Sequence, residues 1–322
     1  MASARASVLA LCIGAAVLGG AVAAKEVLPE VGPLGATTMQ RLLLVDAERS
    51  GSRIVAVGDR GYIVYTDDQG KSWKRAKTPP APMLTALDFL DDQQGIAVGH
   101  DSVILATKDR GETWTQVFAA PGEQRPLLDV IYPSRDLIVA IGAYGAYYDS
   151  TDGGKTWNAR KVLQDDKHLN AILELGDNHL LLIGEAGTML SSDDMGKTWK
   201  PLASPYKGSF FGGLVASDNS VVVYGLRGHI FRSTDRGKTW KAVENKSTAA
   251  LIGGDKLPDG ALVVAGSAGT VLVSRDNGVS FQPVATGTTR AFGKVLVGTE
   301  GKILALGEAG VREIALPWSS KP

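Results

Sequence analysis

The chain has 322 residues, and its 34 Lys or Arg residues balance 34 Asp or Glu residues. A net charge of zero argues against a basic nucleic-acid-binding protein, and 44% hydrophobic residues exclude a disordered chain. Glycine is the outlier, with 39 residues, or about 12% against an ordinary ~7%. Because these glycines follow no three-residue period, they indicate many tight turns, which are typical of an all-β protein.

The first residues have the pattern of an export signal. Arg5 supplies the positive charge, an apolar run follows, and Ala21 to Ala23 are the small residues expected before a cleavage site. We expect a signal peptide over 1–24 and a single domain over 25–322, in a periplasmic or secreted protein. The apolar run is short for a membrane span of about 20 residues. Cys12 is the only cysteine, so the exported chain is expected to rely on packing rather than disulfides.

One eight-residue pattern, Ser/Thr-x-Asp-x-Gly-x-Thr/Ser-Trp, recurs along the chain. The six copies are TDDQGKSW (66–73), TKDRGETW (107–114), STDGGKTW (150–157), SDDMGKTW (192–199), STDRGKTW (233–240) and SRDNGVSF (274–281). Their closing aromatic residues are 41 to 43 residues apart. The spacing indicates a structural repeat of about 41 residues.

A second marker, Gly-x-x-Gly, counts the repeats independently. It opens at Gly58, Gly99, Gly142, Gly184, Gly225, Gly266 and Gly307, and in the second copy Ser102 replaces the closing glycine. Short runs rich in Val and Ile flank each marker, which is the length and composition of β-strands. Two residues between such strands make a tight hairpin.

Each repeat therefore predicts four strands, A to D, with the glycine marker between B and C and the octapeptide between C and D. Seven such repeats predict a seven-bladed β-propeller with four-stranded blades. The first strand A is expected at about Met39 to Asp46. After Gly310 only Val311 to Leu316 remains, so the last blade lacks strand D. We expect the N-terminal segment Lys25 to Val31 to fill that place and close the ring, as an edge strand because of Pro29.

The octapeptide resembles the Asp box of the bacterial neuraminidase repeat. Its aspartate can accept backbone N–H bonds within a tight turn, and its glycine can take positive φ. The aromatic residue then starts strand D and can pack between blades. We interpret the motif as structural in each blade, and the alternative is a calcium or glycan site at each turn.

In such a blade, the B–C hairpins and the D–A connections share one face, at the mouth of the central channel. Its expected partner-binding residues are Arg60, Arg125, Tyr144, His168, Lys207, Arg227 and Arg290. Two interpretations stay open, an ordinary solvated rim or a basic mouth that docks an acidic protein surface.

Catalysis is not expected from these residues. A glycoside hydrolase needs two carboxyl groups about 5–9.5 Å apart, and Glu185 and Glu308 belong to blades on opposite sides of the ring. The segment Phe-Arg-Ile-Pro of sialidases is absent from the sequence, and the four histidines lack metal-ligand spacing. We expect no catalytic residue, metal or cofactor. The alternatives are a sialidase-like glycoside hydrolase and a glycan-binding propeller, for which Tyr144 and Tyr206 are the exposed aromatic candidates.

The export signal, the seven compact repeats, the Gly-x-x-Gly hairpins and the Asp-box turns together resemble the photosystem II stability and assembly factor family. The resemblance implies a non-catalytic scaffold that assists the maturation of a membrane protein complex, in the thylakoid lumen if the host is photosynthetic. It implies that a basic patch receives the partner, and Arg60, Arg125, Arg227 and Arg290 are the counterparts here. The expected partner is a membrane protein complex or its subunit, with no nucleic acid and no small-molecule cofactor, bound by a protein that is monomeric by itself.

Overall fold

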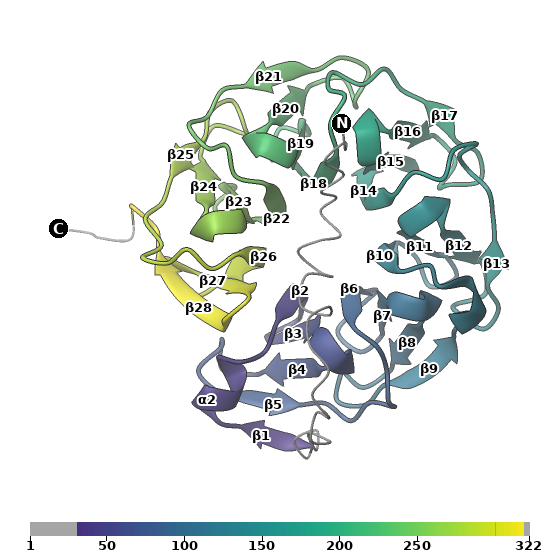
Figure 1. The fold of residues 1–322 in the computed structure, drawn as a ribbon, viewed down its shortest axis with the longest axis vertical. Helices are drawn as coiled ribbons and strands as arrows, with labels where there is room; N and C mark the ends of the chain where they lie inside the picture. Colours follow the sequence, from purple (N-terminus) through teal and green to yellow (C-terminus); the bar gives the residue numbers. More distant parts are fainter. Residues whose placement is uncertain (1–30, 300, 319–322) are drawn as a thin grey trace, which may run out of the picture. The chain divides into compact units, whose positions relative to one another are not determined.

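The computed structural model describes residues 31–299 and 301–318, and the predicted signal peptide lies outside them. Seven antiparallel sheets follow one another around a common centre (Figure 1). The inner strand of each sheet packs against the inner strand of the next, and β26 of the last blade packs against β2 of the first. The predicted seven-bladed β-propeller is thus confirmed.

Each blade runs outward from strand A to strand D, as the repeat predicts. The A strands are β2 (Leu44–Ser50), β6 (Leu84–Phe89), β10 (Leu127–Ile131), β14 (Leu169–Gly176), β18 (Phe210–Val215), β22 (Leu251–Lys256) and β26 (Phe292–Val297). The B strands are β3 (Arg53–Gly58), β7 (Gly95–Gly99), β11 (Ile138–Gly142), β15 (His179–Gly184), β19 (Val221–Gly225), β23 (Leu262–Gly266) and β27 (Lys302–Gly307).

The outer half of each blade is shorter. The C strands are β4 (Ile63–Thr66), β8 (Ile104–Thr107), β12 (Tyr147–Ser150), β16 (Met189–Ser192), β20 (Ile230–Ser233), β24 (Val271–Ser274) and β28 (Gly310–Ala315). The D strands are β5 (Trp73–Arg75), β9 (Thr115–Phe118), β13 (Asn158–Ala159), β17 (Lys200–Pro201), β21 (Lys241–Val243) and β25 (Gln282–Pro283).

The core lies between the blades rather than at one central point. The B strands are buried along almost their whole length, because each is covered on both faces by neighbouring blades. One cluster, for example, joins Val55 and Val57 of the first blade to Leu105 and Trp114 of the second. Continuous apolar runs are therefore the pattern that this position requires.

The glycine marker forms a short 3₁₀ turn in six blades. These turns are η1 (Asp59–Gly61), η2 (His100–Ser102), η4 (Ala143–Gly145), η5 (Glu185–Gly187), η6 (Leu226–Gly228) and η7 (Ser267–Gly269), and another, η3 (Pro121–Glu123), lies in a D–A connection. The first glycine is needed for close approach, since a Cβ at Gly58 would lie 1.9 Å from the carbonyl oxygen of Leu43. The second residue of each glycine-marker turn has positive φ although it is not glycine, as at Tyr144 (φ 55°).

The Asp box is a self-contained turn, which supports its structural interpretation. In the second copy, Asp109 accepts hydrogen bonds from the hydroxyls of Thr107 and Thr113 and from the backbone N–H of Thr113. Trp114 is buried and donates its ring N–H to the carbonyl of Gly111 at 3.0 Å. The carboxylate–hydroxyl pairs recur in all six copies, so these aspartates are occupied by their own turns.

The chain also forms a strand ahead of the first blade. In the described residues the seventh sheet has three strands, and β1 (Gly32–Leu34) pairs with β5 of the first blade. The segment expected to complete blade seven, Lys25 to Val31, lies outside the described residues except for Val31, so its pairing stays a prediction. The strand that follows it is held on the first blade because Leu34 packs beside Trp73 in the apolar cluster between blades one and seven.

Helix α2 (Ala36–Met39) follows and covers the same junction. Leu42 then accepts the backbone N–H of Gly310 at 2.9 Å, and the first strand A begins at Leu44 rather than at about Met39. At the other end of the chain, Trp318 packs against the cluster between blades six and seven. In other blades that side of the sheet receives the Asp-box aromatic residue, so Trp318 substitutes for the missing motif.

Candidate functional site

The hairpins and the D–A connections share one face, as predicted, because hydrogen bonds tie them together. Within blade four, the backbone N–H of Glu185 binds the carbonyl of His168 at 2.8 Å. Between blades, Gly145 donates to the carbonyl of Lys167, and Gly187 donates to the carbonyl of Gly208, both at 2.8 Å. Each connection therefore runs between two turns, and we call the surface that they form the mouth face.

All seven predicted partner-binding residues lie on the mouth face, but they do not form one cluster. Arg60, Tyr144 and Arg227 occupy the positive-φ position of their turns. The other four, Arg125, His168, Lys207 and Arg290, lie in the connections that precede A strands. Tyr144 and His168 are the pair among them for which the structure records a direct contact.

That contact belongs to a small polar cluster between blades three and four. The backbone N–H of Tyr144 donates to Nδ1 of His168 at 3.2 Å, and the two rings meet edge to face with centroids 4.9 Å apart. Glu185 accepts the backbone N–H of His168 at 3.1 Å, and its Oε2 is 3.5 Å from Nδ1. The imidazole is 13% exposed, whereas Tyr144 is 46% exposed.

The mouth face has two groups of bases besides Lys77 and Lys167 of its connections. Arg60 lies 3.4 Å from Asp59, and Arg125 lies 3.9 Å from Glu123, so these two have acidic neighbours. For the second group, which we call the basic sector, no ion pair is recorded among the residues that the structure describes. Its members follow one another over blades five to seven: Lys207, Arg227, Lys246 and Arg290. Lys246 was not among the predicted residues, although it occupies the same kind of connection.

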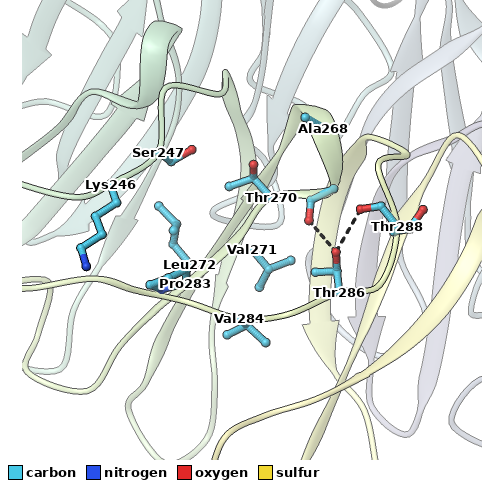
Figure 2. A pocket seen from close by; sticks show the side chains of 11 residues that line it. Lys246, Ser247, Ala268, Thr270, Val271, Leu272, Pro283, Val284, Thr286 and Thr288 are labelled. Carbon is cyan, nitrogen blue, oxygen red and sulfur yellow. Dashed lines mark hydrogen bonds between the residues drawn. The ribbon is translucent and has the colours of Figure 1, made fainter.

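A pocket of about 260 Å³ lies in the basic sector, between the connections that follow blades five and six (Figure 2). Figure 2 shows Lys246 and Ser247 on one side and Thr286 and Thr288 on the other. The hydroxyl of Thr286 donates to the carbonyl of Gly269 at 2.8 Å. The described lining of the pocket contains no carboxylate, so the pocket has no pair of carboxyl groups for glycoside hydrolysis.

Glu185 and Glu308, the glutamates of the B–C turns, each accept a backbone N–H of their own blade. Glu185 accepts the N–H of His168, and Glu308 accepts the N–H of Ala291 at 3.1 Å in blade seven. Both carboxylates thus tie a turn to the start of strand A. Of the aromatic candidates for glycan binding, Tyr206 is half-buried because its ring stacks on His229 at 4.3 Å and joins the apolar cluster of blades four and five.

A charged cluster on the inner strands was missed by the sequence analysis. Each inner strand has a bulge after its first residue, and a carboxylate follows at the same position in blades one and three and two residues further along in blade two. These carboxylates accept backbone N–H groups of the next blade: Asp46 from Leu87, Asp88 from Tyr132, and Asp129 from Ile172. Charged residues inside otherwise apolar A-strand sequences are the signal that could have identified them.

The inner cluster is unevenly neutralised. Burial works against the charge of Lys294, but Asp46, Glu48 and Asp255 outweigh it and hold the pKa of the Lys294 ammonium above its usual value. Its Nζ lies 3.2 Å from Asp46. Burial raises the pKa of Asp88 to about 7, and the carboxylate of Glu48 adds to the effect. Burial also raises the pKa of Asp129 to about 7, although the N–H of Ile172 opposes it.

The described residues include no group of three or more His, Cys, Asp or Glu side chains placed to hold a metal ion. Within the same part of the chain, no helix combines the length and apolar character needed to cross a bilayer.

Comparison with known proteins agrees with this architecture. A family model described as photosynthesis system II assembly factor YCF48 matches residues 110–263, and a BNR/Asp-box repeat model matches residues 64–75. No curated protein has a matching sequence. The fold and the repeated turn define the chain as an Asp-box β-propeller. Its central blades match the photosystem II assembly factor family, so the predicted family resemblance is confirmed.

Solved structures show the same fold. A structure described as YCF48 bound to D1 peptide has 18% identity and a TM-score of 0.68, covering 86% of this chain and 92% of that one. YCF48 from Cyanidioschyzon merolae has 16% identity and a TM-score of 0.66, covering 89% and 98%. The GH74 enzyme of Niastella koreensis has 18% identity and a TM-score of 0.68, covering 88% of this chain but 44% of the enzyme.

Proposed function

We propose that this protein is a non-catalytic, exported assembly factor that binds a segment of a membrane protein subunit on its mouth face. The match to the assembly factor family supports this function. A similar propeller, YCF48, has been solved with a D1 peptide bound, which supports a peptide segment as the form of the ligand. The proposed location is the periplasm, or the thylakoid lumen in a photosynthetic host.

The observation that carries the proposal is the basic sector. Four exposed cations lie on consecutive parts of the mouth face without acidic partners in the described chain, while Glu308 in the same sector is held by a backbone N–H. Free cations without neighbouring acids produce a positive potential, which attracts acidic segments and orients them during encounter. An acidic stretch of a membrane protein subunit fits this surface.

A glycoside hydrolase is less well supported. Likeness to the GH74 enzyme extends over the fold alone, and Glu185 and Glu308 each bind a backbone N–H of their own blade. The pocket in the basic sector offers an ammonium and hydroxyl groups rather than paired carboxyls. These groups suit binding of an anionic side chain better than hydrolysis of a glycosidic bond.

The test is capture of subunits from detergent-solubilised membranes of the host by the purified protein. Changing Lys207, Arg227 and Arg290 together to Glu is expected to reduce capture at least about tenfold, because attraction becomes like-charge repulsion. The difference should shrink in 1 M salt, where the Debye length falls to about 3 Å.

The matched control changes three exposed lysines of Asp-box turns, Lys155, Lys197 and Lys238, to Glu on the opposite face. This variant carries the same change in net charge and should capture subunits as the unmodified protein does. Equal losses in both triple variants, or capture of no membrane protein by the unmodified chain, would contradict the proposed function.

A further inference from the structure

We infer that His168 is a pH-dependent contact of the mouth face, which we call the brace. Neutral His168 accepts a hydrogen bond from the Tyr144 turn, and protonated His168 releases that turn. The inference rests on the proposed function for its biological meaning, because it concerns regulation of the same face. Its physical basis is independent of any partner. It lies in the position of one ring nitrogen between two groups that require it in opposite protonation states.

The recorded hydrogen bond fits a neutral imidazole. Nδ1 of His168 accepts the backbone N–H of Tyr144 at 3.2 Å, so that nitrogen carries a lone pair and the ring proton is on Nε2. Tyr144 has φ 55°, as the equivalent residue has in the other five 3₁₀ turns of the glycine marker, so this conformation belongs to the turn itself. The hydrogen bond and the edge-to-face ring contact are the interactions that His168 adds, and they tie this turn to blade four.

Protonation reverses the role of Nδ1. An imidazolium has a hydrogen on both nitrogens and cannot accept a bond from Tyr144. The acceptor at hand is Oε2 of Glu185, 3.5 Å away and 38% exposed, and a charge-assisted bond to it is stronger than the neutral bond that is lost. The amide of Tyr144 would then turn to water, which it can reach because the residue is 46% exposed.

Glu185 is the charge that decides the balance. On the connection of His168 itself, Lys167 lies 3.3 Å from Asp165 and is neutralised by it, and Asp166 is exposed to solvent. The turn of blade three contributes Tyr144 as its titratable group and no charged residue. Of the charged groups on these elements, Glu185 is the one recorded in contact with the imidazole.

The arrangement is specific to blade four, and blade seven supplies its control. Glu308 occupies the position of Glu185 and accepts the N–H of Ala291, which occupies the position of His168. In blade six Ser267 accepts the N–H of Ala250 in the same way. The carboxylate therefore serves strand entry in two blades, and the imidazole adds the proton dependence to one of them.

The consequence for binding has a defined sign. Protonation adds a positive charge to the mouth face and frees an exposed tyrosine, so an acidic partner should bind more tightly when His168 is protonated than when it is neutral. The device itself can be tested without a partner, on the isotopically labelled full chain. The measurement follows the His168 ring and the Tyr144 amide by NMR between pH 5 and pH 8.

The two signals should change with one midpoint, and amide exchange of Tyr144, corrected for the intrinsic effect of pH, should accelerate several-fold on the acid side. Glu185→Gln should move that midpoint to lower pH because the imidazolium loses its anionic partner. Glu308→Gln should leave it in place. His168→Gln, whose amide oxygen can still accept a bond, should keep Tyr144 protected at both ends of the range.

The inference is overturned if the Tyr144 amide stays constant while His168 titrates, or if both glutamate variants move the midpoint equally. Because no partner is present, neither result bears on subunit capture, and loss of capture does not bear on the brace. The amide signals of the inner strands serve as a check of folding. If they stay unchanged in a variant, its effect on Tyr144 is local and is not caused by unfolding.

Discussion

At the scale of single residues, the Asp-box aspartates show how one side chain organises a turn. Partial burial opposes the ionisation of Asp109, but the hydroxyl and N–H of Thr113 outweigh it and lower the pKa of the carboxyl. In the first copy, the hydroxyl and N–H of Ser72 lower the pKa of Asp68 to about 2. The aspartates therefore stabilise their turns most strongly when ionised, because the carboxylate accepts hydrogen bonds from residues within five positions in the sequence.

Asp109→Ala is expected to lower stability by roughly 1–2 kcal/mol, by analogy with the loss of a helix-capping side chain. Since the folded pKa is depressed, this stabilisation is present above the unfolded value near 4 and is lost as pH falls below it. Denaturant unfolding at pH 7 and pH 3 should therefore show a difference at pH 7 that shrinks at pH 3. Asp166→Ala, at an exposed position, is the control, and an equal effect there would argue against the turn as the cause.

Sequence reasoning was successful where a residue's role follows from its immediate neighbours. The spacing of Asp109, Gly111 and Trp114 was sufficient to predict the turn, because all its hydrogen bonds close within the motif. The same approach missed Asp88 and Asp129, whose partners lie 43 or 44 residues away in the next blade. Contacts between blades depend on how the whole ring curves, so they produce no recognisable pattern in a short stretch of sequence.

At the scale of elements, blade seven shows the limit of the repeat. Strand C of the last blade and strand D of the first blade both have an edge that a further strand can cover, and composition does not say which edge receives the N-terminal segment. In the structure β1 lies on β5, where Leu34 meets Trp73. The gap between blades six and seven is filled from the other end of the chain by Trp318, beneath the guanidinium of Arg275 at 4.9 Å.

Trp318→Ala is expected to destabilise the protein by about 1–3 kcal/mol, less than a fully buried aromatic because the ring is only partly covered. The loss should be concentrated in β28, which Ile314 and Leu316 anchor to the same cluster. Hydrogen exchange should therefore accelerate in β28 more than in the other C strands. Val279→Ala, at an exposed residue, should change neither quantity. Uniform acceleration across all blades would show that Trp318 has no special role in blade seven.

At the scale of the whole molecule, inner-strand carboxylates join one blade to the next. Asp46, Asp88 and Asp129 link blades one to four in series, and Lys294 of blade seven reaches back to Asp46 at 3.2 Å. Lys294 also acts on Glu48 and Asp129, but burial still raises the pKa of Glu48, Asp88 and Asp129. The inner face of the ring therefore holds more negative charge on its first three blades than it neutralises.

This uneven charge predicts how stability depends on pH. A carboxyl with a folded pKa of about 7 binds its proton more tightly than in the unfolded chain, so its stabilisation is complete below about pH 4 and is lost as pH rises through 7. The melting temperature should fall from pH 5.5 to about pH 7.5 and then level off, and the fall is worth at most about 2 kcal/mol for each carboxyl. The double variant Asp88→Asn, Asp129→Asn should flatten this slope, and an unchanged slope would exclude these residues as its source.

The closure described above gives this molecule a particular connectivity. Six of the seven boundaries between neighbouring blades are crossed by the polypeptide itself, whereas blades seven and one meet through side chains, the Gly310–Leu42 hydrogen bond and the Lys294–Asp46 pair. The protein is therefore a linear array of seven blades whose first and last members meet through noncovalent contacts. Opening this one seam breaks no covalent connection and separates no paired strands, so it is the boundary at which the ring can widen at the lowest free-energy cost.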